Sequence, residues 1–249
     1  MINSVIRLKY IMNTKRKITA KEALIEAAAR LFAEKGYDAV STRELAEASG
    51  VNLGAIQYHF GSKARLFVET MAHLWDEPAH QAPLALLLAP AKDEIEAVER
   101  VAQFVSAMLA YLLRDDSTGP CRMMFRETFS SASQDPEMLE ALTTSFVKEI
   151  TQPYNDSMSQ LLRVAAPQAS NEQVEWCARA IIAQCMFPAT QRPFIERMQG
   201  AKLNVNPCFQ KMVTEIVCFT LSVLDLSPAA GAAGREAARR FTEIDAVAG

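Results

Sequence analysis

The 249-residue chain is half hydrophobic and carries a formal net charge of −3, so it can hold a small domain and a larger one, each with a core. No apolar run reaches the ~18 residues of a membrane span, and Arg7 and Lys9 interrupt the N-terminus where a signal peptide would be apolar, so we expect a cytoplasmic protein. Residues 1–70 carry 11 Lys/Arg against 7 Asp/Glu and residues 71–249 carry 15 against 22, a distribution typical of a protein that touches nucleic acid with one end only.

A short basic arm, residues 1–18, opens the chain, and we expect it to be flexible. Lys15, Arg16 and Lys17 are adjacent in it. They predict contacts with DNA phosphates or the minor groove, or else an ordinary solvated tail. Met12 is a second possible start of the protein, so the length of the arm is left open.

The first helix is predicted to begin after Thr19 and to end at Gly36. Thr19 and Glu22 have the spacing of a capping box, which satisfies the free backbone donors of a helix start. Its buried face carries apolar residues at helical spacing: Leu24, Ala28, Leu31 and Phe32. No readout chemistry lies on this helix, so it is predicted to support the helices after it.

Two short helices joined by a tight turn are predicted next. Ser41 and Glu44 form a second capping box, and Gly50 supplies the positive φ that ends the helix. Asn52 is a suitable N-cap for the following segment, 53–60. This pattern indicates a helix-turn-helix within a domain of residues 19–62.

The second of these helices presents its outer face to solvent. Ile56 and Phe60, four residues apart, share its buried side. The opposite side then carries Gly54 and Tyr58, flanked by Ala55 and Gln57. Gly54 is expected inside the helix, where it costs roughly 1 kcal/mol against Ala, and where a bare backbone would allow a groove wall or phosphate to approach.

Lys63 is expected at the start of the next helix, directly after the N-cap Ser62. A positive charge is unfavourable at that end of a helix dipole unless an anion such as a DNA phosphate binds there. Taken alone, Gly54 can be interpreted as a tolerated glycine and Lys63 as a solvated lysine. Together, at this spacing, they favour a DNA-binding role.

These residues are similar to the DNA-binding domain of the TetR family of transcriptional regulators. The resemblance covers about residues 19–67 without gaps and is carried by Thr42-Arg43-Glu44-Leu45-Ala46, Gly50-Val51, Gly54, Tyr58-His59-Phe60, Ser62-Lys63 and Leu66-Phe67. Gln57 departs from the family, which often has Tyr there, so the contact of that position with DNA is open.

The resemblance implies which residues meet DNA. Base edges would be read by Arg43 and the outward face of the second helix, which carries Leu53, Gly54, Ala55 and Gln57. Gln57 is able to pair bidentately with adenine. Phosphates would be held by Thr42, Tyr58, His59 and Lys63. Packing around Phe60 is the alternative for Tyr58 and His59.

The rest of the chain is predicted to be helical, so the fold class is all-α. The resemblance assigns a regulatory and dimerisation domain to residues 63–227, beginning with a linking helix whose tilt carries the signal. The helical periods fall in 63–77, 93–113, 122–131, 136–163, 171–198 and 207–226. The stretch 93–113 has two apolar stripes, which predict a central buried helix, and Pro188 and Pro193 are predicted to break the far end of 171–198. Prolines predict a loop over 78–92 and a kink at Pro153, and the Ala/Gly-rich tail 228–249 is predicted to be disordered or a frayed helix.

The body also resembles, in patches, the CecR-type body of this family. The family implies a homodimer through helices 171–187 and 207–226, whose broad apolar faces agree with it, although intramolecular core is the alternative. A small-molecule pocket would be lined by aromatic, Met and a few polar side chains. The candidates are Trp75, Phe104, Met108, Tyr111, Arg122, Met124, Phe125, Arg126, Phe129, Phe146, Tyr154 and Met186. Arg126 is the preferred polar anchor for the ligand; plain core, or a salt bridge to Glu127 or Asp116, is the alternative.

No catalytic constellation, cofactor motif or metal site is found in the sequence. The five cysteines form no CxxC pair and are interpreted as buried free thiols, and Pro78 interrupts the one possible metal face, of His73, Asp76 and His80. The resemblance to the TetR family therefore implies a repressor that binds a pseudo-palindromic operator as a homodimer and is released by a small, largely apolar molecule. A DNA-binding activator, or an interaction module without small-molecule control, is the alternative.

Overall fold

The computed structural model describes residues 18–76, 78–113, 123–124, 126–127, 135–200 and 205–240. All regular structure in these ranges is helical, which confirms the all-α class, and none of their helices is long and apolar enough to cross a membrane. Six of the predicted contact residues lie outside the described ranges: Lys15, Arg16, Lys17, Arg122, Phe125 and Phe129.

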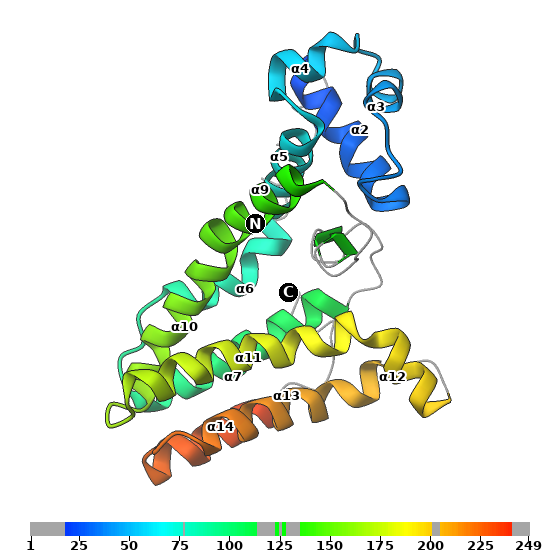
Figure 1. The fold of residues 1–249 in the computed structure, drawn as a ribbon. Helices are drawn as coiled ribbons and strands as arrows, with labels where there is room; N and C mark the ends of the chain where they lie inside the picture. Colours follow the sequence, from blue (N-terminus) through cyan, green and yellow to red (C-terminus); the bar gives the residue numbers. More distant parts are fainter. Residues whose placement is uncertain are drawn as a thin grey trace, which may run out of the picture.

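A small head of three helices stands at one end of the molecule (Figure 1). It consists of α2 (Ala20–Lys35), α3 (Thr42–Ser49) and α4 (Gly54–Phe60). Both halves of the capping box at Thr19 are present, so the predicted start of the first helix is confirmed. Aromatic rings fill the head core: Phe32 lies 5.0 Å from Phe67 between ring centroids, in an edge-on arrangement.

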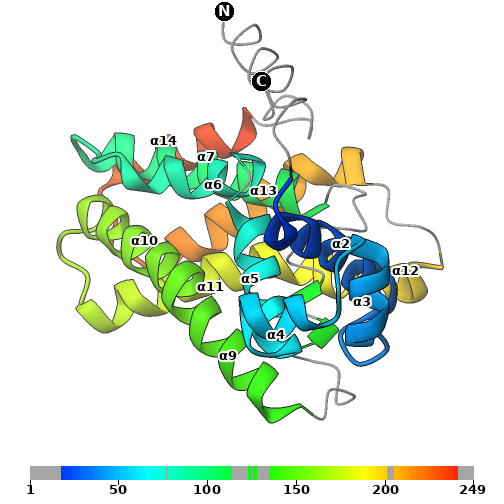
Figure 2. The same cartoon turned by 90° about the horizontal axis from the view of Figure 1, so that it is seen from above.

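The head core continues into the helices below it. The linking helix α5 (Lys63–Trp75) leaves the head and runs beside α9 (Pro136–Phe146), as Figures 1 and 2 both show. Buried methionines from residues 123, 124 and 138 join the same apolar cluster as the rings of the head. The head is therefore attached to the body through a shared core as well as through the chain.

The segment predicted as a loop after α5 contains a helix instead, α6 (Pro78–Leu88). Pro78 is its first residue, where a proline costs no hydrogen bond because the first helical N–H groups have no intrahelical partner. The helix includes Pro83. Proline was interpreted as an interruption, whereas at position 78 it starts the next helix.

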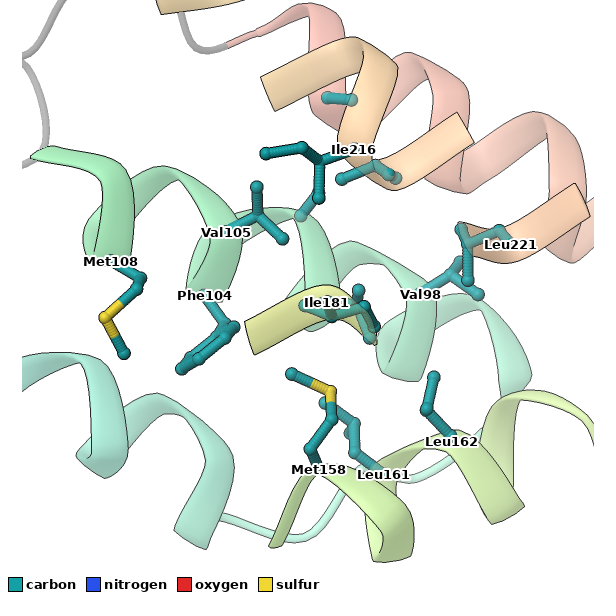
Figure 3. Packing of buried hydrophobic residues seen from close by; sticks show 14 of the residues in the cluster. Val98, Phe104, Val105, Met108, Met158, Leu161, Leu162, Ile181, Ile216 and Leu221 are labelled. Atoms are coloured by element: carbon teal, nitrogen blue, oxygen red, sulfur yellow. The ribbon is translucent and has the colours of Figure 1, made fainter. Parts of the chain in front are cut away.

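The central helix of the body is α7 (Glu94–Leu113), as its two apolar stripes predicted. Helices α6, α10, α11, α13 and α14 all contact it. Figure 3 shows Val98, Phe104 and Val105 of α7 facing side chains from these neighbours, among them Ile181 and Ile216. Removing so much apolar surface from water is the main stabilising contribution to the body.

Near Pro153, where a kink was predicted, the structure has one turn of π-helix. The turn, Val147–Thr151, separates α9 from α10 (Gln152–Ala165). Proline in the first turn of α10 cannot donate to a carbonyl of the preceding turn, and a π turn accommodates the lost hydrogen bond.

The last helices form the far side of the body: α11 (Asn171–Thr190), α12 (Arg192–Gln199), α13 (Val205–Ser222) and α14 (Pro228–Arg239). The break predicted within 171–198 lies at Gln191, whereas Pro188 is accommodated inside α11. The interpretation of the tail as disordered or frayed is wrong over 228–239, because α14 packs on α7 and α13 with its small residues buried.

Candidate nucleic-acid interface and effector region

The helix-turn-helix begins where the sequence predicts it, with one difference at its first cap. Ser41 Oγ accepts from Glu44 N–H at 3.1 Å, which satisfies one of the free donors at the start of α3. The Glu44 carboxylate, however, binds Lys35 Nζ at 2.5 Å and does not close the capping box. At the other end Gly50 has φ +70°, the left-handed conformation expected for a C-cap glycine.

Gly54 is the first residue of α4 and does not lie in the interior of the helix. The cap of this helix comes from Asn52, whose Oδ1 accepts from Ala55 N–H at 3.0 Å. A Cβ on residue 54 would come 3.3 Å from that same Oδ1. The glycine thus leaves room for the Asn52 cap, a structural reason for its presence that the sequence analysis did not find.

The outer face of α4 carries the predicted readout residues. Tyr58 is 84% exposed and Leu53, just before the helix, is 54% exposed, although both are large and mostly apolar. Gln57 is also exposed, and Ile56 and Phe60 are buried as predicted. His59 is half-buried, with its ring 4.9 Å from that of Tyr58. Solvent-facing apolar groups on a short helix are typical of a contact surface.

Arg43 stands on the exposed side of α3 and is already oriented. Its Nε lies 3.0 Å from Glu47 Oε1, one turn further along the helix, and the two side chains are 84% and 67% exposed. Such a pair contributes little to stability. It leaves the terminal nitrogens of the guanidinium available, while Thr42 beside it is half-buried.

Lys63 is placed differently from the expectation. Its ammonium turns into the head, donating to the carbonyls of Tyr37 at 2.8 Å and of Val40 at 2.9 Å. It also lies 4.0 Å from the centroid of the Tyr37 ring. Burial of the ammonium lowers the pKa of Lys63, against nearby carboxylates that raise it. Lys63 therefore braces the loop before α3, and it is not the free phosphate ligand that the sequence predicted.

Arg126 is likewise a contact between head and body. Its guanidinium donates to the carbonyl oxygens of Phe32 and Ala33 in the last turn of α2, the second at 2.9 Å. Its Nε lies 3.0 Å from the carboxylate of Glu127, whose side chain is only 5% exposed. These contacts occupy the guanidinium that was predicted to anchor a ligand. The predicted alternative of a pair with Glu127 is present, and the other predicted partner, Asp116, lies outside the described residues.

The aromatic residues predicted for the effector pocket that the structure describes form two groups of rings. The ring of Trp75 lies 6.4 Å from that of Tyr111 and 6.1 Å from that of Phe146, and Phe104 lies 6.0 Å from Tyr154. The rings come from the helices α5, α7, α9 and α10.

The remaining predicted effector residues are more dispersed. Met108 is buried on α7, Met186 is half-buried on α11, and Met124 belongs to the head cluster. Beside Trp75 and Phe146 the structure holds a cavity of only about 20 Å³, less than the volume of a small ligand. A larger groove of about 380 Å³, which the sequence analysis did not predict, lies between α10 and α11 and is lined by polar residues: Asn155, Asp156, Ser159, Gln160, Arg163, Glu175 and Arg179.

The helices predicted to pair between subunits leave large apolar side chains in solvent. Trp176 is 63% and Phe187 is 59% exposed on α11, while Phe219 on α13 and Val223 just after it are 66% and 54% exposed. Figure 1 shows α11 and α13 running side by side on the outer side of the body. The predicted alternative, that these positions are intramolecular core, does not hold for these four residues.

Two family models match the chain. The model of the bacterial regulatory proteins of the tetR family matches residues 24–70. The model of the C-terminal domain of the HTH-type transcriptional dual regulator CecR matches residues 97–223, half of the chain. The two matches correspond to the head and to most of the helical body.

Curated relatives match over part of their own length. The HTH-type transcriptional repressor AcnR of Corynebacterium efficiens is 42% identical over 53 residues, 21% of this chain and 28% of that protein. The dual regulator CecR of Shigella flexneri is 32% identical over 117 residues, 45% of this chain and 52% of that protein. The matches thus span between about a quarter and a half of these relatives' own lengths.

Solved structures share the whole fold at low identity. FadR of Bacillus subtilis in complex with stearoyl-CoA matches with a TM-score of 0.54 and 16% identity, over 78% of this chain and 96% of that one. AibR in complex with isovaleryl coenzyme A and operator DNA matches with a TM-score of 0.53 and 15% identity, over 81% and 97%. These likenesses extend over head and body together.

Proposed function

Because the chain belongs to the TetR family of bacterial regulatory proteins, we propose that it is a ligand-responsive repressor that binds a pseudo-palindromic operator as a homodimer. The outer face of α4 carries this proposal. A recognition helix inserted in the major groove needs side chains that stand free of the head, and those of Leu53, Gln57 and Tyr58 do.

The residues divide into those that read bases and those that hold phosphates. Gln57 is the candidate for bidentate pairing with adenine, and Arg43, with its terminal nitrogens available, is the candidate for guanine. Thr42, Tyr58 and His59 would position the duplex through its backbone. Lys63 is left out of this set because its ammonium is occupied inside the head.

The homodimer is supported by the exposed face of α11 and α13. Between Trp176 and Phe187 on α11 the same face carries Ala180 and Ala183, which allow a partner helix to come close. Two copies of the pair would form a four-helix interface and place two α4 helices on one duplex. Half-sites would then lie about one helical turn, ~34–36 Å, apart.

The effector is proposed to be a small, largely apolar molecule held in the body beneath the head. The aromatic rings of Trp75, Tyr111 and Phe146 and the adaptable side chain of Met108 favour an apolar ligand. The neighbouring FadR and AibR structures contain acyl-coenzyme A thioesters, so these are the first compounds to test. The ligand must bind the DNA-free and DNA-bound states with different affinity in order to release the operator.

The test is DNA selection with the full-length chain, followed by gel shifts on the selected duplex and on the region upstream of its own gene. We expect a pseudo-palindromic sequence whose binding weakens steeply with salt. Gln57→Ala should relax the preference at one base position in each half-site, whereas Gln160→Ala, an exposed glutamine of α10, should leave it unchanged. Selection of no sequence at low salt would favour the interaction module instead.

Addition of acyl-coenzyme A thioesters of several chain lengths to the bound complex tests the effector. Release by one of them would support an acyl-coenzyme A effector. Retention with all of them would exclude these thioesters but not a smaller apolar ligand. Reporter expression with and without the protein separates a repressor from an activator.

A further inference from the structure

Tyr37 lies two residues beyond the end of α2, and each of its polar atoms has a partner. Its N–H donates to Glu127 Oε1 at 3.1 Å, and its hydroxyl donates to Asp135 Oδ2 at 2.5 Å. Its carbonyl accepts from Lys63 Nζ at 2.8 Å. The residue is 1% exposed and belongs to the head core. Because Glu127 and Asp135 belong to the body, the body holds the head directly at this residue.

Arg126 holds the neighbouring end of α2. Carbonyl groups in the last turn of a helix lack intrahelical partners, and a cation there is also favoured by the helix dipole. The Arg126 guanidinium donates to two carbonyls of that turn, those of Ala33 and of Phe32, the second of which also accepts from Gly36 N–H at 3.0 Å, and it is itself held by Glu127. Gly36 passes close by: a Cβ there would lie 3.5 Å from both Arg126 Nε and Glu127 Oε1.

The loop between α2 and α3, which Glu127 and Asp135 bind at Tyr37, leads directly into the helix-turn-helix. Only three residues separate Tyr37 from Ser41, the N-cap of α3. The head is also attached through helix α5, reached after α4, and through the apolar core that it shares with Met123, Met124 and Met138. The polar contacts at the loop before α3 add a directional constraint at the end of the helix-turn-helix opposite to α5.

We propose that Arg126 and Glu127 are positioning residues for operator recognition, which set the orientation of the DNA head on the body. The proposal rests on the proposed function and adds to it a second route by which the body controls the head, besides the linking helix. A change in the body that withdraws this pair would free the α2–α3 loop while leaving the contacts of α4 with a half-site intact. Its signature is a change in the spacing between half-sites, not in the reading of one half-site.

The experiment compares full-length variants on two kinds of duplex. One duplex carries both half-sites, at the selected spacing or with one base pair added or removed; the other carries one half-site, with the second scrambled. Arg126→Ala should lose roughly tenfold in affinity for the selected spacing, within the range typical of coupling between two parts of a protein, and should discriminate less between spacings. Affinity for the single half-site should stay as in the wild type.

Arg100→Ala is the matched control. Arg100 also binds a carbonyl just beyond a helix end, that of Ala89, and a glutamate, Glu96, but it does so within the body. It should therefore leave the spacing preference unchanged. Glu127→Gln keeps an acceptor for the Tyr37 N–H and should lose less than Glu127→Ala.

Hydrogen exchange of the free protein gives a readout without DNA. In Arg126→Ala the amides of α3 should exchange faster while those of α14 do not change. The positioning role would be overturned if Arg126→Ala kept the spacing preference of the wild type. It would also be overturned if Arg126→Ala lost affinity equally for one and two half-sites, with a lowered melting temperature and faster exchange throughout the protein. If the wild type binds no duplex, the proposed function fails. The exchange rates of α3 in Arg126→Ala then decide alone whether Arg126 and Glu127 restrain the loop between α2 and α3.

Discussion

Replacement of Lys63 by Met distinguishes a brace of the head from a phosphate contact. The change keeps the apolar stem of the side chain and removes its ammonium. Two carbonyl groups, of Tyr37 and Val40, would lose their charged donor, at 2.8 and 2.9 Å. The loop before α3 would lose its tie to α5.

The expected loss of stability is set by these interactions. A hydrogen bond to a charged group contributes about 1.5–3 kcal/mol, and a cation over an aromatic ring about 0.5–1 kcal/mol at an exposed site. Part of this is offset, because the half-buried ammonium is desolvated, as the lowered pKa of Lys63 indicates. We therefore expect a net loss of about 1–3 kcal/mol, or roughly 2–12 °C in melting temperature for a chain of this size.

Thermal unfolding followed by circular dichroism measures this loss of stability. Titrations of the operator at several salt concentrations measure how many phosphates the protein contacts. If Lys63 is a brace, the slope of log K against log salt is unchanged. If it is a phosphate ligand, the slope falls by roughly 0.9 for each phosphate that one subunit no longer binds. Lys21→Met is the control, because Lys21 makes an exposed pair with Glu69 at 2.6 Å in the same head.

A smaller salt slope together with an unchanged melting temperature would refute the reasoning from the structure. It would mean that the ammonium leaves its two carbonyls when DNA binds, at no cost to the head. A lowered melting temperature for Lys21→Met as large as that for Lys63→Met would also contradict it, because an exposed ion pair contributes only about 0–1 kcal/mol.

Three further predictions concern other parts of the molecule. Gly234→Ala should lower the free energy of unfolding by about 1–3 kcal/mol, less the gain from helix propensity, because its Cβ would come 2.8 Å from a leucine side chain of α13. Gly231→Ala should leave the free energy of unfolding unchanged or raise it by up to about 1 kcal/mol. Denaturant titrations that give the same sign for both variants would contradict this. Phe219→Arg should convert the dimer to a monomer in light scattering, and a dimer of wild-type affinity would exclude this face. The hydrogen bond from the Tyr37 hydroxyl lowers the pKa of Asp135 below its ordinary 3.8, so this bond stabilises the fold above pH ~4 and the stabilisation is lost as the pH falls through the lowered pKa. The melting temperature of the wild type should therefore exceed that of Asp135→Asn above pH ~4, and the difference should shrink as the pH falls. A difference that stays constant with pH would refute this role of Asp135.

The head could be predicted from sequence because its signals are local. Capping residues such as Thr19 and Ser41 and the C-cap Gly50 act within a few positions of themselves, and all three take their expected places. Gly54 and Lys63 were interpreted less well, because their roles depend on interactions outside the helix period. Gly54 makes room for the Asn52 side chain, and Lys63 binds carbonyls 23 and 26 residues earlier in the chain.

The body was predicted well in its helices and poorly in what their side chains do. The two apolar stripes of α7 predicted a central helix, because a helix that is buried on two faces has apolar residues at helical spacing on both. Arg126, by contrast, binds carbonyls of α2 more than 90 residues away, and no period connects the two. The tail was misjudged from composition: Ala and Gly suggest disorder, but small residues also allow helices to approach closely, as Gly234 does in α14.

The position of α14 bears on the order in which the chain folds during synthesis. The helices of the head and α5 end by Trp75, so they can form while the rest is still being made, and Met123, Met124 and Met138 join their core later. The central helix α7 ends at Leu113, yet the helix that covers Val98 does not end until Arg239. At usual rates of translation the ribosome needs on the order of ten seconds to cover that interval. During this time an apolar strip of α7 stays open to water and to chaperones, although the helices of the head have already been made.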